Sequence, residues 1–304
     1  MSGSIRDFVG YGREQPQFEW PGGKRMALSL VVNYEEGGEN CVLDGDESSE
    51  ALNSDVAGAQ PRRGRRNLAV ESHYEYGSRV GHWRILDLLH ECKIPATYFA
   101  VSSALEKHPE AARSIVQEGH EVVSHGARWI DYDTVDCEIE NRHMSQSLDV
   151  IERLCGVRPV GWYTGRVSPN TRSLAQKHGL LYDCDVYNDD LPYWTQTNDS
   201  PHLVLPYSFD CNDMRYATAP GFNTPDDFIG HLQRTLDCLR RESKTHPKMM
   251  SIGLHLRLAG RPGRAEALRE FLMRATNHED IWFCRREDIA RFWIERFPAH
   301  RTQS

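Results

Sequence analysis

Residues 25–37 read Arg-Met-Ala-Leu-Ser-Leu-Val-Val-Asn-Tyr-Glu-Glu-Gly, an almost continuous apolar run that ends in two adjacent carboxylates. A run of this length without alternation is typical of a parallel strand that is buried on both faces. Such strands belong to α/β proteins, in which helices cover the sheet. The stretch therefore predicts an α/β fold, with Glu35 and Glu36 just beyond the carboxyl end of its first strand.

Strand and helix patterns alternate through most of the remaining chain. The expected strands are 96–101, 121–124, 159–163, 180–182, 202–205, 248–254 and 281–283, and the expected helices are 78–91, 109–118, 134–154, 170–178, 225–241, 263–276 and 286–297. This alternation predicts a parallel sheet of about seven strands, closed or nearly closed into a distorted (β/α) barrel.

The chain organisation predicts a single catalytic domain over residues 1–304. Residues 1–25 are expected to form an irregular N-terminal arm that is packed by its aromatic rings. Residues 37–70 form a long polar insertion, and insertions of that length in a compact domain are usually functional. We expect this insertion to be a contact between subunits.

The composition of the chain argues against nucleic acids and membranes as binding partners. Hydrophobic residues make up 39% and charged residues 26%, as in a globular enzyme, and the net charge of −8 disfavours nucleic acid. No apolar stretch approaches the ~18 residues of a membrane span, and the N-terminus lacks a signal-peptide pattern. The eight cysteines form no CxxC pair and are expected to be reduced thiols. We therefore expect a cytoplasmic protein with no membrane partner.

Polar side chains follow the strands at the end where barrel enzymes build their active sites. They come from five separate strands: Glu35 with Glu36, His125, Arg166, Asp183 with Asp185, and His255. Each of these residues alone has the alternative role of a strand-end cap. Their occurrence after five strands favours one shared site.

The order of these groups resembles the polysaccharide deacetylase family, in its NodB-type catalytic domain, over residues 26–256. The resemblance implies that Glu35 stands at the catalytic-base aspartate and Glu36 at a metal-ligand aspartate. It places His125 at the first histidine ligand and Trp129 at the second. Tryptophan has only an N–H donor and cannot ligate a cation.

The same resemblance assigns the remaining strand-end residues. Arg166 corresponds to the arginine that orients the base, and His255 to the general-acid histidine. Asp183 and Asp185 correspond to the family's aspartate motif.

The chain resembles more closely the metal-independent allantoinase branch of this family, over nearly its whole length. The matching stretches are 7–12, 33–39, 71–77, 125–126 with 128–130, 161–166, 189–194 and 260–264. One departure is Ala127, where a large aromatic residue is common. The resemblance implies a hydrolase that opens the cyclic amide of allantoin to give allantoate, without a metal or other cofactor, and a homotetramer.

The two adjacent glutamates are both candidates for the general base. Two close carboxylates do not both ionise cheaply, so one pKa is expected to rise toward neutrality. Neighbouring residues on a strand point to opposite faces, so Glu35 and Glu36 need not share the site. We favour Glu36 as the residue that faces it.

The other strand-end residues have roles that fit hydrolysis without a cation. Arg166 or His125 is expected to donate to the developing oxyanion. His255 is the expected proton donor to the leaving nitrogen. Either Asp183 or Asp185 is expected to orient this histidine, and the sequence does not choose between them.

The substrate is expected to be a small cyclic ureide or imide held by side chains around these groups. The residues expected to hold it are Tyr34, Glu35, Glu75, Tyr76, Trp129, Asp183, Asp185, Trp194 and Arg257. Two alternatives stay open. One is a metal-dependent deacetylase or cyclic imidase that recruits a cation through Glu36 and His125. The other is a non-catalytic protein that binds a ureide or a sugar.

Overall fold

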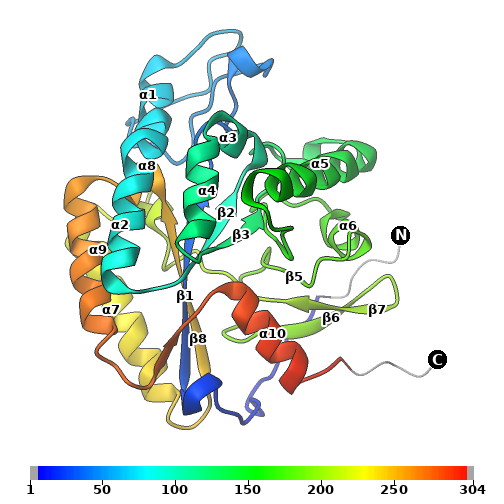
Figure 1. Ribbon diagram of the computed structural model, residues 1–304, viewed down its shortest axis with the longest axis vertical. Helices are drawn as coiled ribbons and strands as arrows, with labels where there is room; N and C mark the ends of the chain where they lie inside the picture. The colour runs from blue at the N-terminus through cyan, green and yellow to red at the C-terminus, as the bar shows by residue number, and fades with distance from the viewer. Residues whose placement is uncertain (1–5, 300–304) are drawn as a thin grey trace.

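The computed structural model describes residues 6–299, whose strands form one nine-stranded sheet (Figure 1). The strands are β1 (Met26–Tyr34), β2 (Ala96–Ala100), β3 (Glu121–Ser124), β4 (Gly161–Trp162), β5 (Tyr182–Asp183), β6 (Tyr193–Thr197), β7 (Ser200–Val204), β8 (Lys248–His255) and β9 (Ile281–Phe283). They pair in the order β6-β7-β5-β4-β3-β2-β1-β8, and β9 pairs with the beginning of β1. Among the strands of residues 6–299, β6 and β7 are the one antiparallel pair. The α/β class is confirmed, with nine strands instead of about seven.

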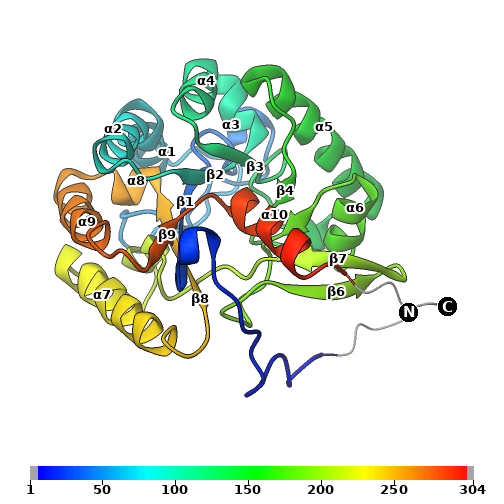
Figure 2. The same cartoon turned by 60° about the horizontal axis from the view of Figure 1, so that its bottom comes forward.

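Most helices lie in an arc outside this sheet, whereas α10 lies within the arc and packs against the inner core (Figure 2). The bounds of all the helices are as follows. They are α1 (Leu68–Tyr76), α2 (His82–Cys92), α3 (Ser102–Lys107), α4 (Pro109–Gln117), α5 (Cys137–Cys155), α6 (Thr171–Lys177), α7 (Pro225–Glu242), α8 (Leu256–Ala259), α9 (Pro262–Ala275) and α10 (Arg286–Arg296). Short helical turns are η1 (Pro21–Gly23), η2 (Val42–Asp44), η3 (Gly77–Gly81), η4 (Tyr132–Thr134) and η5 (Asp213–Tyr216). No helix within residues 6–299 has both the length and the apolar character needed to cross a membrane.

The side chains of β1 alternate between two cores. The larger ones pack outward against the helices; they are Met26, Leu28, Leu30, Val32 and Tyr34. Ala27 and Val31 point inward, where Phe99 of β2 and Val123 of β3 also pack. Because strand side chains alternate with a period of two, Asn33 and then Glu35 fall on the inner side.

An irregular stretch closes the gap between β5 and β8. This closing segment, residues 205–212, begins where the Leu205 amide donates to the Asp183 carbonyl, 2.9 Å away. It ends where the Gly253 amide of β8 donates to the Cys211 carbonyl, also 2.9 Å away. Arg286 is fully buried inside the barrel and donates to the Leu205 carbonyl and to Ser251 of β8. The barrel is thus completed by irregular backbone that a buried guanidinium holds.

The arm and the insertion lie at opposite ends of the strands. Within the described part of the arm, the Trp20 indole donates to the carbonyl of Lys248, the first residue of β8. Residues 1–5 of the expected arm lie outside the described residues. The insertion reaches the carboxyl ends of the strands, where its Asn53 carbonyl accepts from Arg257, 2.8 Å away.

Candidate active site

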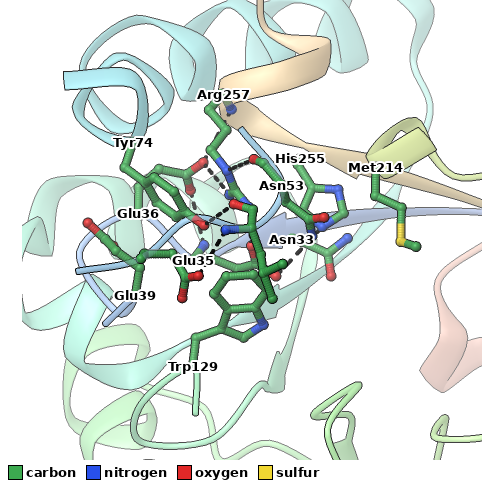
Figure 3. Close-up of polar contacts among 12 residues, drawn as sticks. Asn33, Glu35, Glu36, Glu39, Asn53, Tyr74, Trp129, Met214, His255 and Arg257 are labelled. Atoms are coloured by element: carbon green, nitrogen blue, oxygen red, sulfur yellow. Dashed lines mark hydrogen bonds and ion pairs between the residues drawn. The ribbon is translucent and has the colours of Figure 1, made fainter. Parts of the chain in front are cut away.

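Glu35 and His125, which directly follow β1 and β3, meet His255, the last residue of β8, at the carboxyl ends of these strands. Figure 3 shows Glu35 and His255 in this cluster. The Glu35 Oε1 atom lies 3.2 Å from Nε2 of His125 and 3.6 Å from Nε2 of His255. All three residues are buried. The other ring nitrogen of His125 faces the Tyr163 carbonyl at 3.1 Å, which fixes the orientation of the imidazole. The sequence-based expectation that both histidines belong to one site agrees with this geometry.

Arg257 is the cation at the centre of this cluster. Its guanidinium lies 2.6 Å from Oε2 of Glu35 and 3.2 Å from Oε1 of Glu36. The third donor, Nε, bonds the Asn53 carbonyl, and the guanidinium carbon lies 4.0 Å from the centre of the Tyr74 ring. The side chain is fully buried. We expected Arg257 to hold substrate, whereas its donors are directed at protein acceptors.

Glu36 does not face the two histidines, so our choice of Glu36 as the base was wrong. Its Oε2 accepts from the Glu35 amide at 3.0 Å, and its Oε1 accepts from both the amide and the guanidinium of Arg257. Its carboxylate packs directly over Gly77. The alternation of β1 places Glu36 outside the barrel and Glu35 inside it.

Asp213 orients His255. Its Oδ1 lies 2.7 Å from Nδ1 of the imidazole, and both carboxylate oxygens accept from the His255 amide. Asp213 is fully buried and begins η5, directly after the closing segment. A carboxylate on Nδ1 leaves Nε2 directed at Glu35, as in a histidine that transfers protons.

The charges in this cluster shift the pKa values of Glu35 and His255 in opposite directions. Burial opposes ionisation of Glu35, yet Arg257, His255 and His125 hold its pKa well below the usual range. Burial disfavours the imidazolium of His255, yet the carboxylates of Glu35 and Asp213 raise its pKa to about 9. At neutral pH the site therefore contains a carboxylate beside a protonated imidazole.

Asp183 and Asp185 do not contact His255, so the expectation that one of them orients it was wrong. Asp183 bonds Arg172 at 2.7 Å and lies 3.2 Å from His202, while Asp185 accepts from backbone amides of residues 164–165. Between them, Cys184 points into the inner core. Period-two alternation from Cys184 turns the flanking aspartates away from the interior.

Trp129 and Arg166 form a stacked pair beside the cluster. The Arg166 guanidinium carbon lies 3.9 Å from the centre of the Trp129 ring, and Arg257 lies 5.7 Å from it. One Arg166 nitrogen, Nη2, is buried without a hydrogen-bond partner among the described residues. Trp129 thus forms one wall of the site. The Nη2 donor of Arg166 beside this wall is free to bind an acceptor.

Four expected substrate-binding residues lie elsewhere. Tyr34 points outward and bonds Ser78 and His108. Glu75 and Tyr76 belong to α1; Glu75 is exposed beside Arg79, and the hydroxyl of Tyr76 accepts from Arg84. The Trp194 indole donates to the Phe297 carbonyl. The structure therefore does not bring these four side chains to the cluster: Tyr34, Glu75 and Tyr76 bond groups outside it, and Trp194 packs beside the inner core. Their contact with substrate stays a prediction.

The sequence reading missed four residues around the cluster. Asp213, Asn53 and Tyr74 contact its members as described above. Glu39 lies near Arg257, and burial raises its pKa to about 7. Tyr74 and Glu39 stand inside stretches 71–77 and 33–39 that the sequence analysis had singled out. No periodic pattern marks Asp213, because an irregular segment precedes it.

The metal implied by the wider resemblance does not fit these residues. A catalytic zinc ion takes three protein ligands and keeps one open position. Glu36 is saturated by Arg257 and backbone amides, and Trp129 offers no lone pair to a metal. The guanidinium of Arg257 already pairs with the two carboxylates that would face a metal ion, and its positive charge opposes a second cation beside them.

Comparisons with known proteins agree with this architecture. The family model "Polysaccharide deacetylase" matches residues 65–182. A putative polysaccharide deacetylase of Schizosaccharomyces pombe (strain 972 / ATCC 24843) is 41% identical, over 96% of this chain and 98% of the relative. The fold also matches two solved structures at 51% identity and a TM-score of 0.95.

The first of these structures is a PuuE allantoinase, covering 98% of this chain and 99% of that one. The second is a probable polysaccharide deacetylase from Pseudomonas aeruginosa PAO1, covering 98% of this chain and 100% of that one. The fold is therefore the NodB-like deacetylase fold, an α/β half-barrel sheet with helices outside it, and the closing segment spans its open side. This chain belongs to the polysaccharide deacetylase family.

Proposed function

We propose that this hydrolase opens the amide bond of a small cyclic ureide, with allantoin as substrate and allantoate as product, and that it does so without a metal ion. The observation that carries this proposal is the double pairing of Arg257 with Glu35 and Glu36. That pairing supplies positive charge inside the cluster from the chain itself. The similarity to a PuuE allantoinase at 51% identity supports the choice of substrate.

In the proposed reaction, water adds to a ring carbonyl carbon and the neighbouring C–N bond breaks. Glu35 accepts the proton of the attacking water, as a carboxylate within hydrogen-bond reach does. His255 donates its Nε2 proton to the leaving ring nitrogen, while Asp213 holds Nδ1. The carbonyl carbon becomes a carboxylate and the nitrogen becomes the NH₂ of a urea group. Solvent then returns the two proton carriers to their starting states.

The oxyanion that develops on the carbonyl oxygen needs hydrogen-bond donors. Arg166 is our candidate, because its Nη2 is buried and unpaired beside Trp129. Donors that are already oriented stabilise such charge more than water does. The flat indole of Trp129 offers a surface on which a planar ring stacks.

A substrate panel tests the proposal. The protein is incubated with allantoin, hydantoin, succinimide and an acetylated chitooligosaccharide, each with and without EDTA. We expect hydrolysis of allantoin that EDTA leaves unchanged. Hydrolysis of the acetylated sugar alone, abolished by EDTA, would support the metal-dependent deacetylase instead. Binding of allantoin without turnover at any pH would support the non-catalytic alternative.

A further inference from the structure

Three metal-ligand side chains gather outside the candidate active site, between the closing segment and α7. Asp210 and Cys211 come from the closing segment, and His231 comes from α7. Their ligand atoms all lie within 4.8 Å of one another. Carboxylate oxygen, thiolate sulfur and imidazole nitrogen are the donors that Zn²⁺ takes in proteins.

The spacing of these atoms is close to that of a tetrahedral zinc site. Oδ2 of Asp210 lies 3.2 Å from Nε2 of His231 and 3.8 Å from Sγ of Cys211. Tetrahedral bonds of ~2.0–2.3 Å place neighbouring ligand atoms roughly 3.3–3.7 Å apart. Small side-chain rotations are thus enough for these ligands to surround an ion.

The residues around these three side chains leave space for an ion to enter and orient Asp210. Asp210 and Cys211 line a cavity of about 1320 Å³ between the N-terminal arm and the closing segment. That cavity leaves room for an incoming ion and for water as a fourth ligand. The Ser208 hydroxyl donates to the other oxygen of Asp210 at 2.8 Å, which orients the carboxylate.

We propose that Asp210, Cys211 and His231 bind one Zn²⁺ ion, with water completing the tetrahedron. The ion links α7 to the end of the closing segment, where the Cys211 carbonyl accepts from Gly253 of β8. Asp213, which positions His255, is two residues further along the chain. The ion therefore acts as a clamp on the irregular part of the barrel, and it takes no part in the reaction proposed above.

Cobalt substitution tests the site on the full-length protein. After dialysis against chelator, titration with Co²⁺ is expected to give one equivalent of tetrahedral d–d absorption and a thiolate-to-cobalt charge-transfer band. Zn²⁺ is expected to displace both signals and to raise the melting temperature. His231→Gln is expected to weaken binding at least ~10-fold, and Cys211→Ser to abolish the thiolate band.

Cys238→Ser is the matched control, because it makes the same substitution at a cysteine that lies on α7 beside Glu242 and outside the cluster. It is expected to keep the wild-type spectrum. Two outcomes would contradict the proposal: no thiolate band in the wild type, or loss of this band in Cys238→Ser as in Cys211→Ser. Asp210 and His231 would then form a surface hydrogen bond and no zinc site. If Cys211→Ser does not fold, the His231→Gln variant still tests the site, because His231 is partly exposed. Neither result bears on allantoin hydrolysis.

Discussion

Glu35 and Glu36 lie on opposite faces of the chain at the end of β1, and their partners differ accordingly. Glu35 faces His125 and His255, whereas the oxygens of Glu36 accept from backbone amides and from Arg257. The sizes of the β1 side chains indicate which of the two glutamates faces the interior. Large residues occupy the outward positions, and small or polar residues occupy the inward ones that lead to Asn33 and Glu35.

Substitution of the two glutamates separates their roles. Glu35→Gln removes the proposed base without changing side-chain volume, so kcat is expected to fall by roughly 10²–10⁴. Glu36→Gln removes the negative charge that faces Arg257 and is expected to lower the free energy of unfolding more than it lowers kcat. Steady-state kinetics and denaturant unfolding of both variants measure this. A Glu35 variant with wild-type kcat would contradict the assignment.

The pH dependence of the rate depends on the proton of His255. Glu35 and Asp213 together raise the pKa of this buried histidine to about 9, so the imidazolium is lost as pH rises through that value. We expect kcat/KM to decline there. Asp213→Asn removes one carboxylate, so the pKa of His255 falls and the decline begins at lower pH.

Rate profiles across the neutral and alkaline range measure this shift. Asp190→Asn is the control, because Asp190 is exposed and has no contact with His255. An alkaline limb at the same pH in wild type and Asp213→Asn would argue against His255 as the proton donor.

Most helices and strands were predictable as elements, because each has its own hydrophobic period. The expected helix at 225–241 is α7 (Pro225–Glu242), and the expected strand at 248–254 is β8 (Lys248–His255). The closing segment has no period: it contains Pro206, and its backbone bonds are irregular. Asp213 follows it directly. A search at strand ends therefore could not find Asp213, the residue that orients His255.

The turn η3 packs against the Glu36 carboxylate and so helps to hold it in place. Gly77 has helical dihedrals (φ −57°, ψ −48°) that suit alanine, but an added Cβ there would collide with the Glu36 carboxylate. Gly77→Ala is therefore expected to cost about 1–3 kcal/mol of stability and to lower activity by displacing Glu36 and Arg257.

Gly263→Ala is the matched control, since a Cβ at this exposed position of α9 meets nothing within 4 Å. It is expected to be neutral or to stabilise by about 0.4–1 kcal/mol. Thermal melts and kinetics of the two variants are compared. Equal stability of the two variants would show that Gly77 is not needed for close packing.

At the scale of the whole molecule, the barrel brings residues far apart in sequence into one charged cluster. Glu35 and His125 directly follow β1 and β3, Asp213 begins η5, and His255 ends β8. The α/β class and the two histidines were predictable, because parallel strands end at one edge of a barrel. Which aspartate pairs with His255 depends on how the barrel closes, and that closure is a tertiary property.

The homotetramer implied by the family resemblance is a prediction about the whole molecule. Light scattering coupled to size-exclusion chromatography is expected to give four times the chain mass of 34.9 kDa. A monomer at all concentrations would remove the proposed role of residues 37–70 as a subunit contact.

The central claim is that Arg257 gives the cluster its positive charge, so that Glu35 and His255 hydrolyse a cyclic ureide without a metal ion. The most direct measurement is kcat/KM for allantoin after exhaustive chelation, with metal content measured on the same sample. The His231→Gln background weakens the zinc site proposed above. We predict a rate equal to that of untreated protein at less than one metal ion per hundred chains. Loss of activity on chelation, restored by one equivalent of Zn²⁺ in this background, would contradict the account.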